Sequence, residues 1–230
     1  MPFKKIKIIT HLLLHRYMWM FIGLLGLILF PAIFYHSLYE NLANLFFNAM
    51  VIFIGVCCIQ RSRKQLYIGL IIGLSVIIIN KLGIWRSQMT INFYLSFVFY
   101  IIFYIYLAFT IFKMIIKSKR VNEGVLFGAV NVYLLIGIIG AYLFMLIEMS
   151  FPGSISNLEL SNIGNPNKYI YFSFVTLSTL GYGDILPIST PAQTLAITLS
   201  TFGPLYLTII VAMLVSRYDQ EKFIETKGKD

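Results

Sequence analysis

Residues Thr176 to Asp184 read TLSTLGYGD and lie between two long apolar segments of a chain of 230 residues. Gly181 and Gly183 alternate with larger residues at the end of this stretch. Successive backbone carbonyls point to one side when right-handed and left-handed dihedrals alternate, and glycine adopts the left-handed conformation without steric cost. Such a row of carbonyls replaces the water around a cation that has left the aqueous phase. The stretch therefore predicts a cation site built from the backbone rather than an ordinary turn.

The composition is that of an integral membrane protein. Hydrophobic residues make up 59% of the chain and charged residues 12%, a balance that excludes an ordinary soluble domain. A membrane-spanning helix requires about 20 apolar residues. Six stretches meet this requirement, at residues 17–35, 42–60, 66–84, 91–112, 125–148 and 192–215. We therefore predict an all-α membrane protein with six transmembrane helices.

The basic residues predict how these helices are oriented. Of the 18 lysines and arginines, all but Lys81, Arg86 and Lys168 fall on one side of the predicted membrane, beside the first, second, fourth and last helices. The positive-inside rule assigns that side to the cytoplasm. We expect a multi-pass protein of the cell (plasma) membrane with both termini cytoplasmic. Because orientation explains the net charge of +9, nucleic-acid binding is rejected.

A short helix is predicted directly before the glycine-containing stretch. Asn165 is a favourable N-cap, and Pro166 suits the first turn of a helix because its missing N–H has no role there. The predicted helix, residues 166–178, is about 20 Å long at about 1.5 Å per residue. It is too short to cross a membrane, so we expect a re-entrant pore helix. Its C-terminal end would carry partial negative charge and attract a cation.

Together, residues 124–218 resemble the outer helix, pore helix, selectivity filter and inner helix of the tetrameric potassium channels. The resemblance implies that K⁺ binds at the filter residues Thr179, Leu180, Gly181, Tyr182 and Gly183. The chain carries a single loop of this kind. Four identical chains would therefore meet around one axis as a homotetramer.

The resemblance also implies roles for residues around the filter. Asp184 matches the acid at the outer mouth, and Pro187 fits the Gly-Asp-x-x-Pro exit from the filter. Glu148 matches an acid that braces the loop after the filter, although a solvated helix end is an alternative interpretation. Tyr171 and Phe172 stand where many members carry tryptophans that support the filter, and Val175 stands where some carry a glutamate.

The last apolar segment contains a candidate hinge and a candidate gate. Proline inside a helix removes a hydrogen bond and crowds the preceding turn, so a bend is expected at Gly203-Pro204. Leu207, Val211 and Val215 form an i, i+4, i+8 stripe. This stripe would either line the cavity and close it by dewetting or face lipid.

Three regions are predicted along the chain. Residues 1–120 form a four-helix membrane domain in the place of a voltage sensor, residues 121–218 form the pore domain, and residues 219–230 form a short cytoplasmic tail. A working sensor carries about 3 to 4 mobile charges per subunit, yet Ile91 to Phe112 contains no lysine or arginine. We therefore expect no voltage gating.

The fourth apolar segment is expected to pack against its neighbours. Its aromatic residues Phe93, Phe97, Tyr100 and Tyr104 recur at helical spacing and form one face. The short connection from Lys113 to Glu123 leaves little reach, which favours packing of the four-helix domain on the pore of its own subunit.

The function predicted from these features is passive, potassium-selective conduction across the lipid bilayer. Two alternatives are a silent or regulatory channel subunit and a potassium transporter subunit, although transporters of that class carry four degraded loops in one chain. No paired carboxylates, activated nucleophile or metal cluster indicates an enzyme. No cofactor is expected apart from the permeant K⁺ ions.

Overall fold

The computed structural model is all-helical over the residues that it describes, which are 16–33, 40–58, 67, 89–118, 120–157 and 166–227. The helices are α2 (Arg16–Ile33), α3 (Glu40–Cys58), α5 (Met89–Lys117), α6 (Glu123–Ser150), α7 (Asn167–Leu177) and α8 (Thr190–Lys227). Within those ranges, β structure is limited to an isolated bridge between Ile155 and Pro187. The predicted all-α class is confirmed for this part of the chain, whereas the predicted helix at 66–84 lies, apart from Tyr67, outside it.

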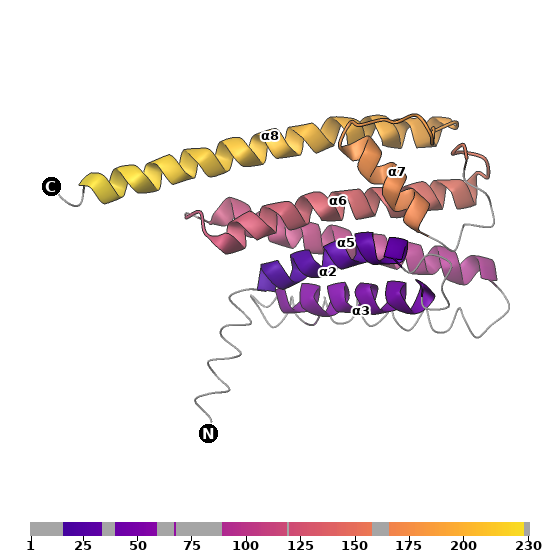
Figure 1. Ribbon diagram of the computed structural model, residues 1–230, viewed down its shortest axis with the longest axis horizontal. Helices are drawn as coiled ribbons and strands as arrows, with labels where there is room; N and C mark the ends of the chain where they lie inside the picture. Colours follow the sequence, from indigo (N-terminus) through magenta and orange to yellow (C-terminus); the bar gives the residue numbers. More distant parts are fainter. Residues whose placement is uncertain are drawn as a thin grey trace, which may run out of the picture.

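Helix α6 is the centre of the arrangement. It packs against α2, α5, α7 and α8, while α2 also packs on α3. In Figure 1, α8 lies along one side of the molecule, α2 and α3 lie on the opposite side, and the short α7 crosses between α6 and α8. The pore-forming segments predicted from the sequence are therefore contiguous, and the N-terminal helices pack behind them.

Three of the described helices are long and apolar enough to cross a membrane. Their qualifying segments are Phe97–Lys117, Glu123–Ser150 and Thr190–Tyr218. These segments coincide with the fourth, fifth and sixth of the predicted spans. The structure therefore supports a membrane protein, and the count of six transmembrane helices stays a prediction.

A short connection places α5 beside α6. Asn122 is the N-cap of α6, and its side-chain oxygen accepts a hydrogen bond from the Val125 N–H at 3.0 Å. Glu123 in the first turn is favourable at the positive end of the helix dipole. Because few residues separate the two helices, α5 folds back along α6 in this chain. Packing of the four-helix domain on the pore of its own subunit stays a prediction.

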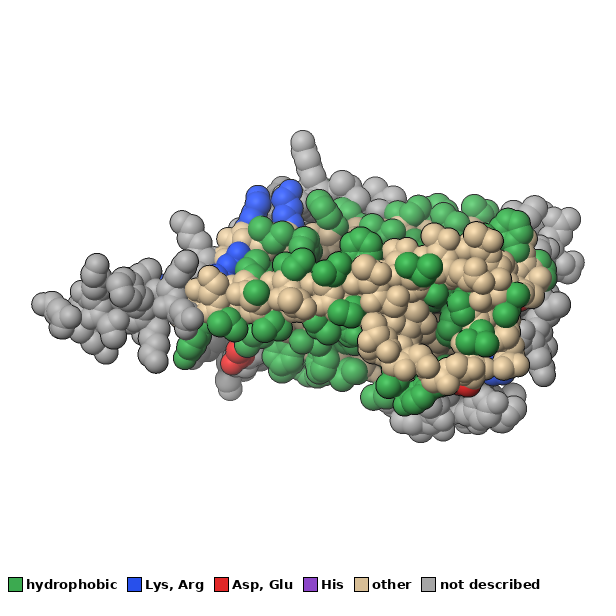
Figure 2. Space-filling model, turned by 90° about the horizontal axis from the view of Figure 1, so that it is seen from above, with side chains coloured by type: hydrophobic (Ala, Val, Ile, Leu, Met, Phe, Trp, Pro, Cys, Tyr) green, Lys and Arg blue, Asp and Glu red, His purple; other side chains and the backbone are tan. Residues whose placement is uncertain are grey.

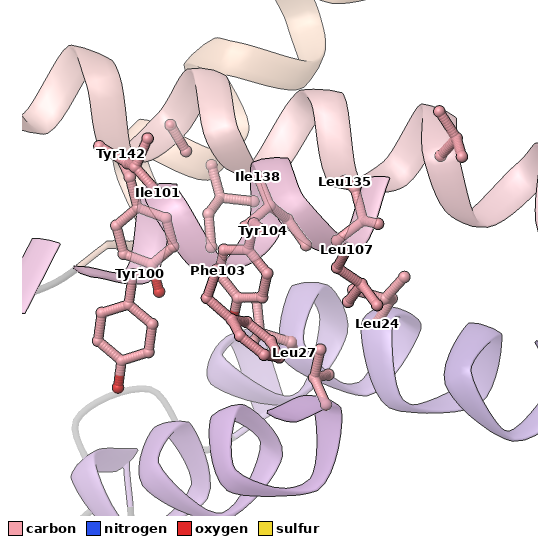
Figure 3. Close-up of a cluster of buried hydrophobic side chains, with 14 of the residues drawn as sticks. Leu24, Leu27, Tyr100, Ile101, Phe103, Tyr104, Leu107, Leu135, Ile138 and Tyr142 are labelled. Carbon is pink, nitrogen blue, oxygen red and sulfur yellow. The ribbon is translucent and has the colours of Figure 1, made fainter. Parts of the chain in front are cut away.

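Aromatic rings fill the contact between α5 and α6. Phe97, Tyr100 and Tyr104 of α5 lie with their ring centroids 5.7, 5.3 and 5.9 Å from that of Tyr142 in α6. All four side chains are buried. Figure 3 shows Tyr100, Tyr104 and Tyr142 in the buried cluster. The predicted aromatic face is thus confirmed for these α5 residues, while the side chain of Phe93 lies outside the described part.

A buried polar contact ties three helices together inside this apolar core. The side-chain oxygen of Asn48 in α3 accepts hydrogen bonds from the hydroxyls of Tyr104 in α5 and Tyr142 in α6, at 2.9 and 3.3 Å. A buried hydroxyl without a partner is costly in an apolar surrounding. Asn48 therefore fixes the relative positions of α3, α5 and α6.

Replacing Asn48 by leucine is expected to lower the free energy of unfolding by about 1 kcal/mol, because two tyrosine hydroxyls lose their acceptor. Thermal unfolding of the purified protein in detergent measures the change. Thr110→Val is the matched control, since the Thr110 hydroxyl donates to the Tyr106 carbonyl of its own helix. Equal unfolding midpoints for the two variants would contradict a role for Asn48 in holding the helices together.

Candidate functional site

The backbone after α7 alternates in handedness at every second residue. The φ angles of Thr179, Gly181 and Gly183 are 59°, 56° and 81°, whereas Leu180 and Tyr182 are not in the positive-φ region. The two glycines accept this conformation freely, but a residue with a side chain is disfavoured there by about 1–2 kcal/mol. The alternation predicted at Gly181 and Gly183 is therefore present. It includes a third position, the strained Thr179, two residues before Gly181.

Hydrogen bonds to α7 fix which way this segment faces. The backbone N–H groups of Leu180 and Gly181 both donate to the Val175 carbonyl in the last turn of α7, at 3.0 and 3.4 Å. In the described part of the chain, the carbonyls of residues 179–183 accept no hydrogen bond. These residues are also exposed within a single chain. Backbone acceptors require a partner. These five consecutive carbonyls are therefore available to a ligand that supplies positive charge.

The short α7 is packed closely against α6. A Cβ atom added at Gly137 would lie 2.4 Å from the Phe174 ring, and one added at Gly140 would lie 2.5 Å from the Ser173 hydroxyl. The Ser173 hydroxyl in turn donates to the Gly137 carbonyl at 2.6 Å. Helix α7 begins at Asn167, directly after Pro166, close to its predicted start, while the predicted cap Asn165 lies outside the described residues.

Gly203 brings α8 against the end of α7. A Cβ atom added there would lie 2.1 Å from the carbonyl oxygen of Leu177, the last residue of α7. The structure shows close packing at Gly203, and the predicted hinge at Gly203-Pro204 stays a prediction. Helix α8 continues through Pro204 without interruption from Thr190 to Lys227 (Figure 1).

Asp184, the predicted outer-mouth acid, is held by α7. Its Oδ2 accepts a hydrogen bond from the Tyr171 hydroxyl at 2.7 Å. This bond, followed by a smaller loss of hydration and the charge of Asp184, raises the pKa of Tyr171 to about 12. The pKa thus moves further above neutral pH, where the Tyr171 hydroxyl is a donor. Phe172 instead packs into the α6 interface, with its ring 4.6 Å from Phe144, so the two predicted support residues serve different contacts.

Glu148 braces the loop that follows α6. Its side chain is 1% exposed, which excludes the alternative interpretation of a solvated helix end. One carboxylate oxygen accepts a hydrogen bond from the Gly153 N–H at 2.8 Å and the other from the Ile155 N–H at 2.9 Å. Buried charge is tolerated when both oxygens are paired in this way.

The loop braced by Glu148 holds the segment that follows residue 183. Residues 154–157 pair with residues 184–188, where Pro187 forms the bridge to Ile155. The contacts are Ser156 N–H to the Leu186 carbonyl at 2.8 Å, Ile188 N–H to the Ser154 carbonyl at 2.7 Å and the Asn157 amide to the Asp184 carbonyl at 2.6 Å. We call residues 154–157 the strap. Glu148 binds the strap at the Ile155 N–H, and Pro187 pairs with the strap at the same residue.

The candidate gate residues of α8 face away from the rest of the chain. Leu207, Val211 and Val215 are 44%, 56% and 55% exposed. Only 17% of the apolar segment of α8 is buried, compared with 61% of the apolar segment of α6. Figure 2, a view onto this side, shows hydrophobic side chains and backbone with a few charged groups near the ends. Such an apolar face requires lipid or further protein to cover it.

Comparison with known proteins supports an ion channel domain in the part of the chain just described. Residues 128–220 match a protein-family model described as "Ion channel". The matched range begins in α6, includes α7 and the alternating segment, and ends in α8. Neither the curated proteins nor the solved structures gave a match. The match supports ion channel function in a membrane.

Sequence analysis missed two contacts of the site. The sequence predicts that Tyr171 supports the filter, but it does not predict the bond from Tyr171 to Asp184. This bond joins positions 13 residues apart, and no short sequence pattern indicates it. The strap at 154–157 was likewise missed, because its residues carry no distinctive motif. The small residues Ser154, Ser156 and Asn157 were the available signal for a turn that bonds to backbone.

Gly203→Ala is expected to destabilise the protein by about 1–3 kcal/mol, because the added methyl group meets a backbone carbonyl that cannot rotate away. Gly23→Ala is the control, since the nearest atom to its added Cβ is a Val51 side-chain carbon at 3.4 Å. That control is expected to be neutral or more stable by up to about 1 kcal/mol. Thermal unfolding in detergent measures both, and a Gly203→Ala protein as stable as the control would favour a pure hinge role.

Tyr171→Phe is expected to free the Asp184 carboxylate and loosen the outer mouth. Amide hydrogen exchange in peptides covering residues 180–188 should become faster by about fivefold, the effect of losing roughly 1 kcal/mol of local protection. Tyr218→Phe, at an exposed tyrosine of α8, is the control and should leave this exchange unchanged. Identical exchange in the two variants would show that the Tyr171 bond contributes nothing to local order.

Proposed function

We propose that the protein is a potassium-selective ion channel that conducts K⁺ passively across the cell membrane as a homotetramer. The observation that carries the proposal is the row of carbonyls at residues 179–183, which accept no hydrogen bond from the described residues and follow positive φ angles at alternate positions. Rings of backbone carbonyls are how potassium filters replace the hydration shell of the ion. The proposed ligands are the backbone oxygens of these five residues, with the Thr179 side chain at the inner end.

The single row supports a fourfold assembly. One chain supplies oxygens from one side only, whereas a dehydrated cation needs them all around. Four copies of the row around an axis meet that need, as in known potassium filters. Tyr182, 66% exposed, and the largely uncovered face of α8 would then be covered by neighbouring copies or line the conduit. The lipid bilayer would cover the remaining apolar surface.

The ends of the row are suited to cations. Helix α7 ends at Leu177, directly before the filter, so the partial negative charge of its C-terminal end favours a cation at the inner side. Asp184 places a carboxylate at the outer side, within reach of the Tyr171 hydroxyl. Anionic groups at a mouth raise the local concentration of cations. K⁺ is therefore the permeant ligand, and the proposal includes no resident cofactor and no enzymatic step.

We further propose that the channel is not gated by voltage. A sensor helix must carry several charges and move relative to the pore. Helix α5 carries no lysine or arginine between Met89 and Phe112. The Tyr94 hydroxyl at its outer end donates to the Met149 carbonyl of α6, and its aromatic face is stacked on Tyr142. Both features support a static α5. We also propose that both chain termini are cytoplasmic, as the distribution of basic residues predicts.

Gly181→Ala is expected to abolish K⁺ flux from liposomes that contain the purified protein, because alanine resists the φ of +56° that aims the carbonyls. Gly153→Ala is the matched control, since it places the same strain at a φ of +83° in the loop after α6, where an added Cβ also meets no atom within 4 Å. The wild type and the control should pass K⁺ in preference to Na⁺. Equal passage of both ions would contradict potassium selectivity.

The same reconstitution separates the alternatives. A silent or regulatory subunit would give no flux alone and would restore flux only beside another channel. A transporter subunit would likewise require partner proteins, because this chain supplies one filter-like loop instead of four. Flux from the purified chain alone contradicts both.

A further inference from the structure

Arg217, at the end of the apolar segment Thr190–Tyr218 of α8, binds the end of α5, a helix far from it in the sequence. Its Nη1 donates to the Ile115 carbonyl at 2.7 Å and its Nη2 donates to the Ile116 carbonyl at 2.9 Å. These carbonyls lie in the last turn of α5, where intrahelical donors become few. The Ile115 carbonyl also accepts a hydrogen bond from the Ser118 N–H at 3.2 Å. A planar guanidinium matches two neighbouring acceptors, and its charge is favourable at the negative end of a helix dipole.

This contact holds a part of α8 whose side chains are mostly exposed. Closer to the filter, the Tyr206 hydroxyl donates to the Ala129 carbonyl of α6 at 2.7 Å, and its ring lies 6.4 Å from that of Phe112 in α5. Beyond Tyr206, most described side chains of α8 are exposed. Ile210 is buried, and Met213 and Leu214 are partly buried against the core. Arg217 thus adds a polar anchor to these apolar contacts, at the end of the apolar part of α8.

On α8, Arg217 faces away from the last residue of the candidate gate. Arg217 lies two positions after Val215, which at about 100° per residue places their side chains roughly 160° apart around the helix. The same rotation places Val211 and Leu207 roughly 120° and 80° from Arg217. Val215, 55% exposed, faces away from α5 and α6. A force that holds Arg217 against α5 therefore also holds the stripe of Leu207, Val211 and Val215 away from the proposed axis.

We propose that Arg217 is a positioning residue that clamps the inner helix to the end of α5 and thereby keeps the inner mouth of the pore wide. Because α5 is itself fixed to α6 along its aromatic face, its end is a stationary anchor. Loss of the clamp lets the apolar stripes of the four inner helices approach one another and close by dewetting. This inference rests on the proposed channel function.

Arg217→Gln is expected to lower the open probability of single channels by at least about fivefold, the effect of losing one charge-assisted contact per subunit. Arg217→Lys should lie between this variant and the wild type, because an ammonium keeps the charge and loses the planar fork. The control is Lys113→Gln, which removes an exposed positive charge from α5 and should leave the open probability unchanged. The ratio of K⁺ to Na⁺ permeability should be the same in all four proteins.

A distance measurement tests the clamp without relying on conduction. Spin labels on Lys117→Cys and Tyr218→Cys, in a background with Cys57→Ser and Cys58→Ser and diluted with unlabelled chains, report the separation of α5 and α8 within one subunit. We expect a single narrow distance that becomes longer or broader with Arg217→Gln and stays unchanged with Lys113→Gln. An unchanged distance with Arg217→Gln would overturn the clamp, even if the protein proved not to conduct.

The two measurements distinguish the possible failures. A wild type that passes no ion, combined with a distance that responds to Arg217→Gln, would overturn the proposed function and retain the clamp. A conducting wild type with an unchanged open probability in Arg217→Gln would overturn the role of the clamp at the inner mouth. An open probability that rises in Arg217→Gln would also overturn it, because the contact would then hold the pore closed.

Discussion

The structure depends on a backbone segment whose N–H groups bind its supporting helix while its carbonyls do not. The N–H groups of residues 179–181 donate to the last turn of α7, and the carbonyls of residues 179–183 accept no hydrogen bond from the described part of the chain. Unpaired backbone acceptors are unfavourable unless a ligand or partner meets them. Left-handed conformations at alternate residues, including the strained Thr179, persist because the surrounding contacts fix them, and such strain is typical of functional sites.

The contacts among α6, α7 and α8 can be understood as support for this segment. On one side, Gly137, Gly140 and Gly203 let α6 and α8 approach α7 to distances that a side chain would forbid. On the other side, Glu148 and the strap at 154–157 fix the segment after residue 183, while Tyr171 holds Asp184. The N-terminal helices extend this support outward, through Asn48 and the tyrosines that stack on α6.

The sequence predicted the helices well because their signal is local. The expected spans 17–35 and 125–148 correspond to Arg16–Ile33 and Glu123–Ser150, since apolar runs end where charged or polar residues begin. The alternation at Gly181 and Gly183 was also predictable, because glycine alone accepts that conformation freely. Three contacts could not be predicted from the sequence, because each joins residues that only the packing of helices brings together. They are the bond from Tyr171 to Asp184, the close approach of Gly203 to α7 and the pair of bonds from Arg217 to α5.

The central claim is that the carbonyls of residues 179–183 from four identical chains surround a dehydrated K⁺ ion. A structure of the purified, assembled protein determined in K⁺ tests this claim most directly. The account predicts a fourfold assembly with ion density on its axis, encircled by these carbonyls, and loss or rearrangement of that density when K⁺ is replaced by Na⁺. A twofold assembly, or carbonyls that face protein with no central conduit, would contradict it.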